Sequence, residues 1–259
     1  MRYSMVNGER IEAQPGLSGQ CPSCGSLTIA KCGELKVRHW AHKGNRKCDP
    51  WWENETEWHR TWKNCFPMDW QEIIHQDKNG ERHIADVKTA QGWVLEFQHS
   101  FLKPEERRAR NAFYEKLIWV VNGVRRMRDK TQFFKLLHEM NPISTNPHIR
   151  KVYLDECALL KEWSGIHCPV FIDFEEDDLW CLMPTNQNMW GYVVAFPRHE
   201  FIAFHNKGAD QVQNFDDCLN KLNSFLNLIL KQRLIQQERS ALQASSFRRN
   251  FLRKQSFRL

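Results

Sequence analysis

Four of the nine cysteines fall within residues 21–48, and this clustering constrains the N-terminal fold more than any other feature. Cys21 and Cys24 form a Cys-x2-Cys motif, and His39 and His42 form a His-x2-His motif further along the same segment. Two thiolates and two imidazoles are the tetrahedral ligand set that zinc prefers, whereas soft sulfur disfavours magnesium and calcium. We therefore expect a zinc site in this segment.

Two further cysteines leave the exact ligand set open, because Cys32 or Cys48 could replace one histidine. The connecting stretch LTIAKCGELKVRHW is typical of two short strands, as in a zinc ribbon. Four protein ligands leave no position for water, so the site would be structural and would stabilise a segment too small to build its own core. The alternative is that the cysteines bind nothing and the histidines are ordinary surface residues.

A candidate helix follows over residues 53–64, ENETEWHRTWKN. Helical spacing places Glu55, His59 and Lys63 on one face. Glu57 would point about 200° away from Glu55, so the two acids cannot serve the same site. An ordinary exposed pair of Glu55 and His59 is the alternative.

Three extended runs come next, WQEIIHQ, HIADVKT and WVLEFQHS, separated by turn signals that include Asn79–Gly80. If residues 90–92 form the second loop, Asp86 lies directly opposite Glu96, with Cβ atoms about 4.5–5.5 Å apart. Two facing carboxylates need a neutralising charge, and oxygen ligands favour Mg²⁺ or Mn²⁺. A two-residue loop would instead put the acids on opposite faces. Both could also be solvent-facing residues of an amphipathic hairpin.

These motifs together resemble the CoiA competence-protein family, which belongs to the broad PD-(D/E)XK group of restriction-like nucleases. The resemblance spans roughly residues 1–125, and a weaker similarity continues in EWSGIHCPVFIDF and DLWCLMP. It is carried by CxxC, HWAH, ENETEWHRTWKNCF, GERHIADVKT, VLEFQHS and EERRARNAFYEKLIWVV.

The resemblance implies a set of catalytic positions. The helix acid would be Glu55 or Glu57, and we favour Glu55 because it shares a face with His59 and Lys63. The strand aspartate would be Asp86, and the E-x-Q pair would be Glu96 and Gln98.

Gln98 stands where the superfamily usually has a lysine. An amide can orient a water or a phosphate but cannot accept a proton, so the general base is left open. Lys63 and Lys88 are candidates for the missing cation.

The activity implied is hydrolysis of nucleic acid, with DNA preferred, in which Asp86 and Glu96 bind Mg²⁺ or Mn²⁺. The pathway would be competence, recombination or antiviral defence. One alternative is a catalytically inactive, zinc-containing nucleic-acid-binding protein. Another is a regulatory or scaffolding subunit that assembles with itself or a protein partner through the leucine-rich residues 215–243.

The order helix, three strands, helix, strand predicts an α/β fold with a mixed sheet flanked by helices, here of the restriction-endonuclease type. The expected regions are a zinc-binding module at 1–50, a nuclease core at 51–140, an accessory β-rich region at 141–214, and an amphipathic helix with a basic tail at 215–259. Strands of the accessory region could extend the core sheet or form a satellite.

The net charge of +6 is concentrated in the tail, since residues 231–259 hold eight basic residues and one acidic residue. Candidate nucleic-acid contacts are Arg107, Arg110, Arg248, Arg249 and Arg253. The alternative is that these arginines are simply solvated and bind no partner. The tail could also bind an anionic membrane surface.

No apolar run approaches the roughly 18–20 residues needed to span a bilayer. The first residues, MRYSMVNGERIEA, lack the apolar stretch of a signal peptide. We therefore expect a cytoplasmic protein with no membrane partner.

Overall fold

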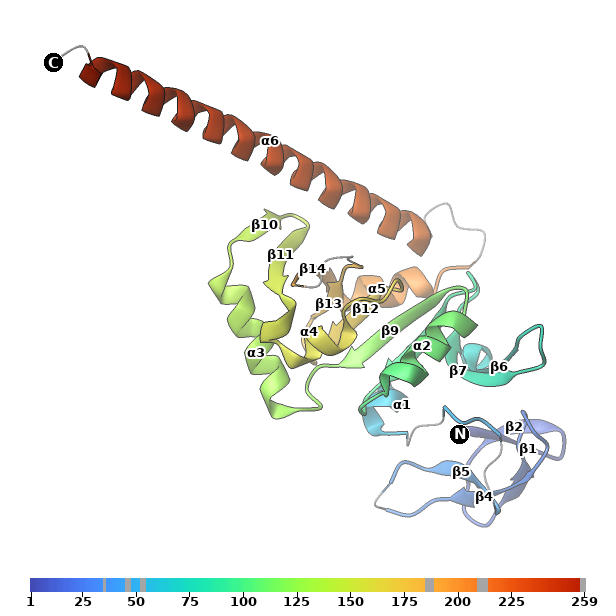
Figure 1. Cartoon of the computed structure of the whole chain (residues 1–259). Coiled ribbons are helices and arrows are strands. Elements are labelled where there is room, and N and C mark those ends of the chain that lie inside the picture. The colour runs from blue at the N-terminus through green and yellow to red at the C-terminus, as the bar shows by residue number, and fades with distance from the viewer. Residues whose placement is uncertain (35, 45–47, 52–54, 185–188, 209–213, 257–259) are drawn as a thin grey trace. The chain divides into compact units, whose positions relative to one another are not determined.

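The computed structural model describes residues 1–34, 36–44, 48–51, 55–184, 189–208 and 214–256, with side chains in the last range only as far as residue 244. The chain divides into two compact units, Met1–Ala209 and Asp210–Leu259. The first is a mixed α/β unit with two sheets, and the second contains the single helix α6 (Phe215–Ser256) (Figure 1). The α/β class and the long C-terminal helix are thus confirmed. Within the described residues, no helix is long and apolar enough to cross a membrane.

The N-terminal sheet is antiparallel, in the order β2-β1-β3-β4-β5. Its strands are β1 (Tyr3–Val6), β2 (Glu9–Glu12), β3 (Ser18–Gln20), β4 (Leu27–Lys31) and β5 (His39–His42). The stretch between the cysteine and histidine motifs forms the hairpin of β4 and β5, as predicted, with Lys31 opposite His39. Met1, Cys21 and Trp40 are buried together under this sheet.

The second sheet has the order β10-β11-β14-β13-β12-β9-β8-β7-β6. Its first four strands along the chain are β6 (Gln71–Gln76), β7 (Arg82–Lys88), β8 (Val94–Gln98) and β9 (Leu117–Asn122). The others are β10 (Pro142–Thr145), β11 (His148–Tyr153), β12 (Val170–Asp173), β13 (Asp178–Leu182) and β14 (Trp190–Pro197). Strands β8, β9 and β12 run parallel, and all other neighbours are antiparallel.

The strands of the expected accessory region therefore extend the same sheet. The expected boundary between residues 140 and 141 directly precedes the hairpin of β10 and β11, which belongs to this sheet. The parallel pairing of β12 with β9 connects the two halves of the chain through backbone hydrogen bonds.

The hairpin of β7 and β8 has the register that a three-residue loop requires. Thr89 N–H donates to the carbonyl of Trp93 at 2.8 Å, and Val87 pairs with Leu95. Gly92 closes the loop with φ +82°, a conformation that glycine adopts without strain. The two-residue loop, which would have separated the acids, is excluded.

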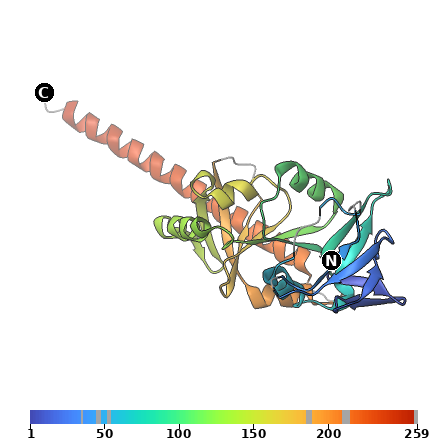
Figure 2. The same ribbon diagram turned by 90° about the horizontal axis from the view of Figure 1, so that it is seen from below.

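Helices cover both faces of the second sheet (Figure 2). They are α1 (Glu57–Lys63), α2 (Pro104–Phe113), α3 (Met127–Glu139), α4 (Ala158–Trp163) and α5 (Arg198–His205). Helix α1 begins later than the predicted start at residue 53, because Thr56 caps it and accepts a hydrogen bond from the backbone N–H of His59. Glu55 therefore precedes the helix, and residues 52–54 lie outside the described part.

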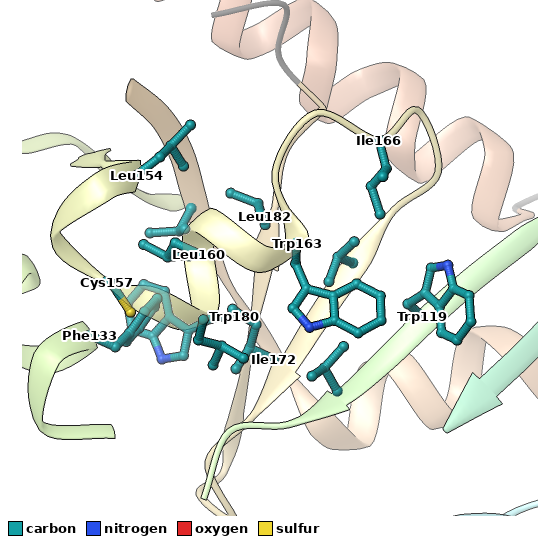
Figure 3. Close-up of a cluster of buried hydrophobic side chains, with 14 of the residues drawn as sticks. Trp119, Phe133, Leu154, Cys157, Leu160, Trp163, Ile166, Ile172, Trp180 and Leu182 are labelled. Carbon is teal, nitrogen blue, oxygen red and sulfur yellow. The ribbon is translucent and has the colours of Figure 1, made fainter. Parts of the chain in front are cut away.

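The main core lies between the sheet and helices α2, α3 and α4. Trp119 of β9 packs against Trp163 of α4 with ring centroids 5.2 Å apart, and Phe133 packs against Trp180 (Figure 3). All residues of β9 are buried, as expected for a parallel strand covered on both faces. This core holds the ends of β8 and β9 in place.

Candidate metal centre and acidic cleft

Four side chains of the N-terminal module form a group that could hold a metal ion. The ligand atoms of Cys21, Cys24, His42 and Cys48 all lie within 4.8 Å of one another. Cys21 and Cys24 come from a tight turn in which Gly25 N–H donates to the Cys21 carbonyl at 2.8 Å. His42 ends β5, and its Nε2 lies 3.3 Å from Cys24 Sγ. Three thiolates and one imidazole suit zinc.

His39 lies outside this group, contrary to its predicted place as a ligand. Its Nδ1 lies 2.8 Å from the Val37 carbonyl oxygen. The reason is strand geometry: side chains three residues apart on one strand point to opposite faces, so His39 and His42 diverge. Cys48 takes the fourth position, one of the two replacements that the sequence left open, and Cys32 lies outside the group.

The thiols of the group differ in acidity. Burial alone would raise the pKa of Cys24, but hydrogen bonds with Ser26 and His42 outweigh it and lower that pKa to about 6. Burial and the neighbouring Cys21 raise the pKa of Cys48 to about 12. Because a bound metal requires thiolates, its affinity will depend on pH.

A cleft beside this module is rich in carboxylates. Five acids line it, Asp49, Glu55, Glu72, Asp86 and Glu96, with the cations Lys63 and Arg110 and with Met1, Trp51, His59, Ile84 and Phe97. The acids come from the segment before α1 and from β6, β7 and β8. Acids therefore outnumber permanently charged bases in the lining.

Asp86 and Glu96 both line this cleft. The register that pairs Val87 with Leu95 places Asp86 opposite Glu96 at the next position. There the Asp86 carboxylate accepts a hydrogen bond of 3.0 Å from the backbone N–H of Phe97. The two acids are thus neighbours at the point where backbone pairing of the hairpin ends.

Glu72 extends this pair to a row of three carboxylates, and the sequence argument missed it. The pairing of Gln71 with Val87 and of Ile73 with Ala85 places Glu72 opposite Asp86. Glu72 has φ +47°, a strained backbone conformation that is concentrated at functional positions.

Lys63 is the cation at the centre of three acids. Its Nζ lies 2.9 Å from Asp86, 3.4 Å from Glu55 and 3.4 Å from Glu72. Burial alone would lower the pKa of Lys63, but the three carboxylates raise it above its usual range and keep the ammonium charged. Glu55 also pairs with Arg60 at 2.7 Å.

Glu96 is paired with Arg110, whose Nη1 lies 2.8 Å from Oε2. The other oxygen, Oε1, is buried and has no hydrogen-bond partner among the described residues. Burial and the nearby Asp86 raise the pKa of Glu96 to about 8, although Arg110 opposes the shift. Among the described residues, the cations that pair with Asp86 and Glu96 are therefore Lys63 and Arg110.

Of the other predicted catalytic residues, His59 lines the cleft, whereas Glu57 and Gln98 do not. His59 lines the cleft, and its Nδ1 accepts a hydrogen bond of 3.2 Å from Thr56 N–H, so the neutral ring carries its proton on Nε2. Glu57 is exposed and does not line the cleft. Gln98 is buried and does not line the cleft. Its side-chain amide donates a hydrogen bond of 3.2 Å to the carbonyl of Ser100.

The arginines proposed to bind nucleic acid are only partly described. Arg110 is buried by its contacts with Glu96 and Glu106, so it does not present its charge at the surface. Arg107 is half-buried, with its guanidinium over the ring of Trp163. The side chains of Arg248, Arg249 and Arg253 lie outside the described residues.

The cysteine group and the cleft are joined by short stretches of chain. Cys48 directly precedes Asp49, which accepts hydrogen bonds of 2.9 Å from His83 and from the backbone N–H of Ile84. Glu72 accepts the backbone N–H of Arg2 at 2.6 Å. Burial opposes ionisation of Glu72, but Lys63 and this backbone contact lower its pKa to about 2.

Comparisons of the chain with protein-family models, with curated proteins and with solved structures gave no match. The geometry of the cleft and of the cysteine group is therefore the basis of the functional argument.

Proposed function

We propose that this chain is a metal-dependent nuclease of the CoiA-like, PD-(D/E)XK type, acting on DNA in competence, recombination or antiviral defence. The observation that carries the proposal is the pairing of Asp86 with Glu96 in a cleft lined by five carboxylates. The order α1-β6-β7-β8-α2-β9 supports the restriction-like assignment, because it is the helix, three-strand, helix, strand order expected from the sequence.

The chemistry of the cleft fits a divalent cation. Oε1 of Glu96 is a buried acceptor with no hydrogen-bond partner among the described residues, and Asp86 is the acid whose charge acts most strongly on this carboxyl group. Asp86 and Glu96 would hold Mg²⁺ or Mn²⁺, with Glu55 as the acid contributed from beside α1. When bound, such an ion polarises a phosphate oxygen and lowers the pKa of a bound water.

The chain's own residues would bind and orient the substrate. Lys63 carries a charged ammonium into the cleft, which supplies the cation that the Gln98 position lacks. His59 lines the same cleft, where its ring would contact a bound phosphate. Arg110 holds the Glu96 carboxylate in position. We propose a structural zinc ion for the cysteine group, which anchors Asp49 through Cys48.

Cleavage assays test the proposal directly. Purified protein is incubated with single-stranded DNA, duplex DNA or RNA, with Mg²⁺ and without added metal. We expect Asp86→Asn and Glu96→Gln each to lower the cleavage rate at least about 100-fold, because each removes part of the charge that binds the ion. Glu57→Gln is the matched control, since this exposed acid lies outside the cleft lining, and it should cleave like the wild type. Unchanged cleavage in both cleft variants would overturn the proposal.

A catalytically inactive nucleic-acid-binding protein is the second candidate. The ion pairs of Lys63 with Asp86 and of Arg110 with Glu96 favour it, because they neutralise both acids without a metal. It predicts that the wild type binds nucleic acid and leaves it intact at every Mg²⁺ or Mn²⁺ concentration.

A further inference from the structure

Two adjacent loops, together with the first residues of the helices that follow them, present large apolar side chains to solvent. Phe101 lies in the loop after β8 and is 64% exposed, and Met127, the first residue of α3 after β9, is 95% exposed. Strands β8 and β9 are parallel neighbours, so both loops leave the same edge of the sheet. The carboxyl-terminal edge of parallel strands is where open α/β sheets bind ligands. In Figure 1 the arrowhead of β9 points toward the side of the unit on which α1 lies.

These loops are firmly held. Arg125 bridges them, because its Nη1 donates to the Ser100 carbonyl at 2.5 Å while its Nη2 pairs with Glu162 at 2.6 Å. The Asn122 side chain contacts His99 at 3.1 Å and accepts the backbone N–H of Val124 at 2.8 Å. The exposed side chains therefore project from a fixed surface.

The same two loop–helix junctions carry exposed positive charge, from Lys103 before α2 and from Arg128 in the first turn of α3. Lys103 and Arg128 are exposed, and neither forms an ion pair with a described residue. Arg126 is also exposed but pairs with Asp129 at 2.7 Å and with Glu162 at 3.0 Å, so its charge is largely neutralised. Lys103 and Arg128 are thus the cations available to an anionic ligand here.

The surface lies close to the acidic cleft. The His99 ring lies 5.9 Å from the ring of His59, which lines the cleft. Phe101 is five residues beyond Glu96, so their Cα atoms are at most about 18 Å apart. A short polymer bound on the loops could therefore reach the acids.

We propose that Phe101, Lys103, Met127 and Arg128 form a binding surface for single-stranded nucleic acid. An exposed Phe ring offers a face on which an unpaired base stacks, and Met127 provides polarisable apolar contact beside it. Lys103 and Arg128 pair with the phosphates. A duplex keeps its bases stacked inside and cannot use the Phe101 face. The inference rests on the proposed nuclease function only in that the bound strand leads to the cleft.

Binding measurements without added divalent metal test the surface, because the strand then stays intact. Short labelled single-stranded DNA, the matched RNA and the matched duplex are titrated by fluorescence anisotropy at several salt concentrations. Phe101→Ala should weaken single-strand binding about tenfold without changing the salt dependence. Lys103→Gln and Arg128→Gln should each lower the slope of log K against log salt by about 0.7.

Arg108→Gln is the matched control, since this α2 arginine is 66% exposed and pairs only with Glu105 among the described residues. It should bind like the wild type. The surface proposal is overturned if Phe101→Ala binds single strands as tightly as the control does. It is also overturned if Phe101→Ala weakens duplex binding by the same factor. Because the readout is binding, a wild type that binds by this surface but never cleaves would refute the nuclease proposal alone.

Discussion

The ammonium group of Lys63 lies 2.9 Å from a carboxylate oxygen of Asp86, and both groups lie in a cleft with two further acids beside the lysine. The Lys63 side chain is 5% exposed. A buried charge is tolerated only when it is paired, and losing one partner leaves the others uncompensated. Lys63 therefore stabilises the fold as well as supplying charge to the cleft.

Replacing Lys63 by alanine should reveal this dual role. The buried carboxylates of Glu55 and Glu72 and the half-buried one of Asp86 would lose their shared cation, so we expect the free energy of unfolding to fall by about 3–5 kcal/mol in urea titrations. Added Mg²⁺ should recover part of the loss, because an ion that binds only the folded state stabilises it.

Lys161→Ala is the control, since this 68% exposed lysine pairs with Asp155 at the surface and should change stability by no more than about 1 kcal/mol. Equal losses in the two variants, or no response of Lys63→Ala to Mg²⁺, would contradict the expectation.

The pKa of Glu96, raised to about 8 by burial and Asp86, gives a pH dependence with a definite sign. In the unfolded chain a Glu carboxyl titrates near about 4.3, so between these values the folded protein holds a proton that the unfolded chain has lost. Without metal, this carboxyl therefore contributes stability below about pH 4.3 that is lost as the pH rises through 8.

Urea unfolding of wild type and Glu96→Gln at several pH values, without divalent metal, measures this contribution. The variant should show a flatter decline between pH 5 and 8 because its amide does not titrate. An identical decline in both proteins would show that other groups cause it.

The ligand set of the cysteine group leads to a further prediction. Zinc content should be about one ion per chain in the wild type, because four protein ligands complete one tetrahedral site. Cys48→Ser should lose the ion, because Cys48 is one of the four ligands. His39→Gln should retain it, because His39 lies outside the group. Elemental analysis of the purified variants decides between them, and loss of zinc in His39→Gln would restore the histidine pair as ligands.

The sequence predicts the parts of the site that depend on local geometry. The pairing of Asp86 with Glu96 follows from a loop length, because hairpin register is set locally. The parity of strand residues could also have separated His39 from His42, once HWAH was recognised as a strand. The place of Glu72 beside Asp86 could not be predicted from the sequence, because the alternation of polar and apolar residues in WQEIIHQ does not indicate that Glu72 has a φ of +47°. Nor could the pairing of Arg110 with Glu96, which depends on how α2 packs against the sheet.

Asp173 is the clearest case of a residue whose role depends on distant contacts, because its sequence context is simply that of a turn. It ends β12 with 1% exposure and accepts hydrogen bonds from the indoles of Trp58 at 2.9 Å and Trp62 at 2.8 Å. Arg198 of α5 forms an ion pair with the same carboxylate. A single buried acid therefore connects β12 to α1 and α5.

Asp173→Ala should lower the free energy of unfolding by about 3–5 kcal/mol, because it leaves the Arg198 charge and two indole N–H groups without their acceptor. Since α1 carries Lys63 and His59 into the cleft, the variant should also lose cleavage activity at temperatures where it remains folded. Urea unfolding followed by tryptophan fluorescence measures the first effect. Glu139→Ala, which removes an exposed acid paired with Lys135, is the control and should change stability by less than about 1 kcal/mol. If Asp173→Ala were as stable as this control, the carboxylate would not connect α1 and α5 to the sheet, and the position of the cleft helix would have to depend on apolar packing alone.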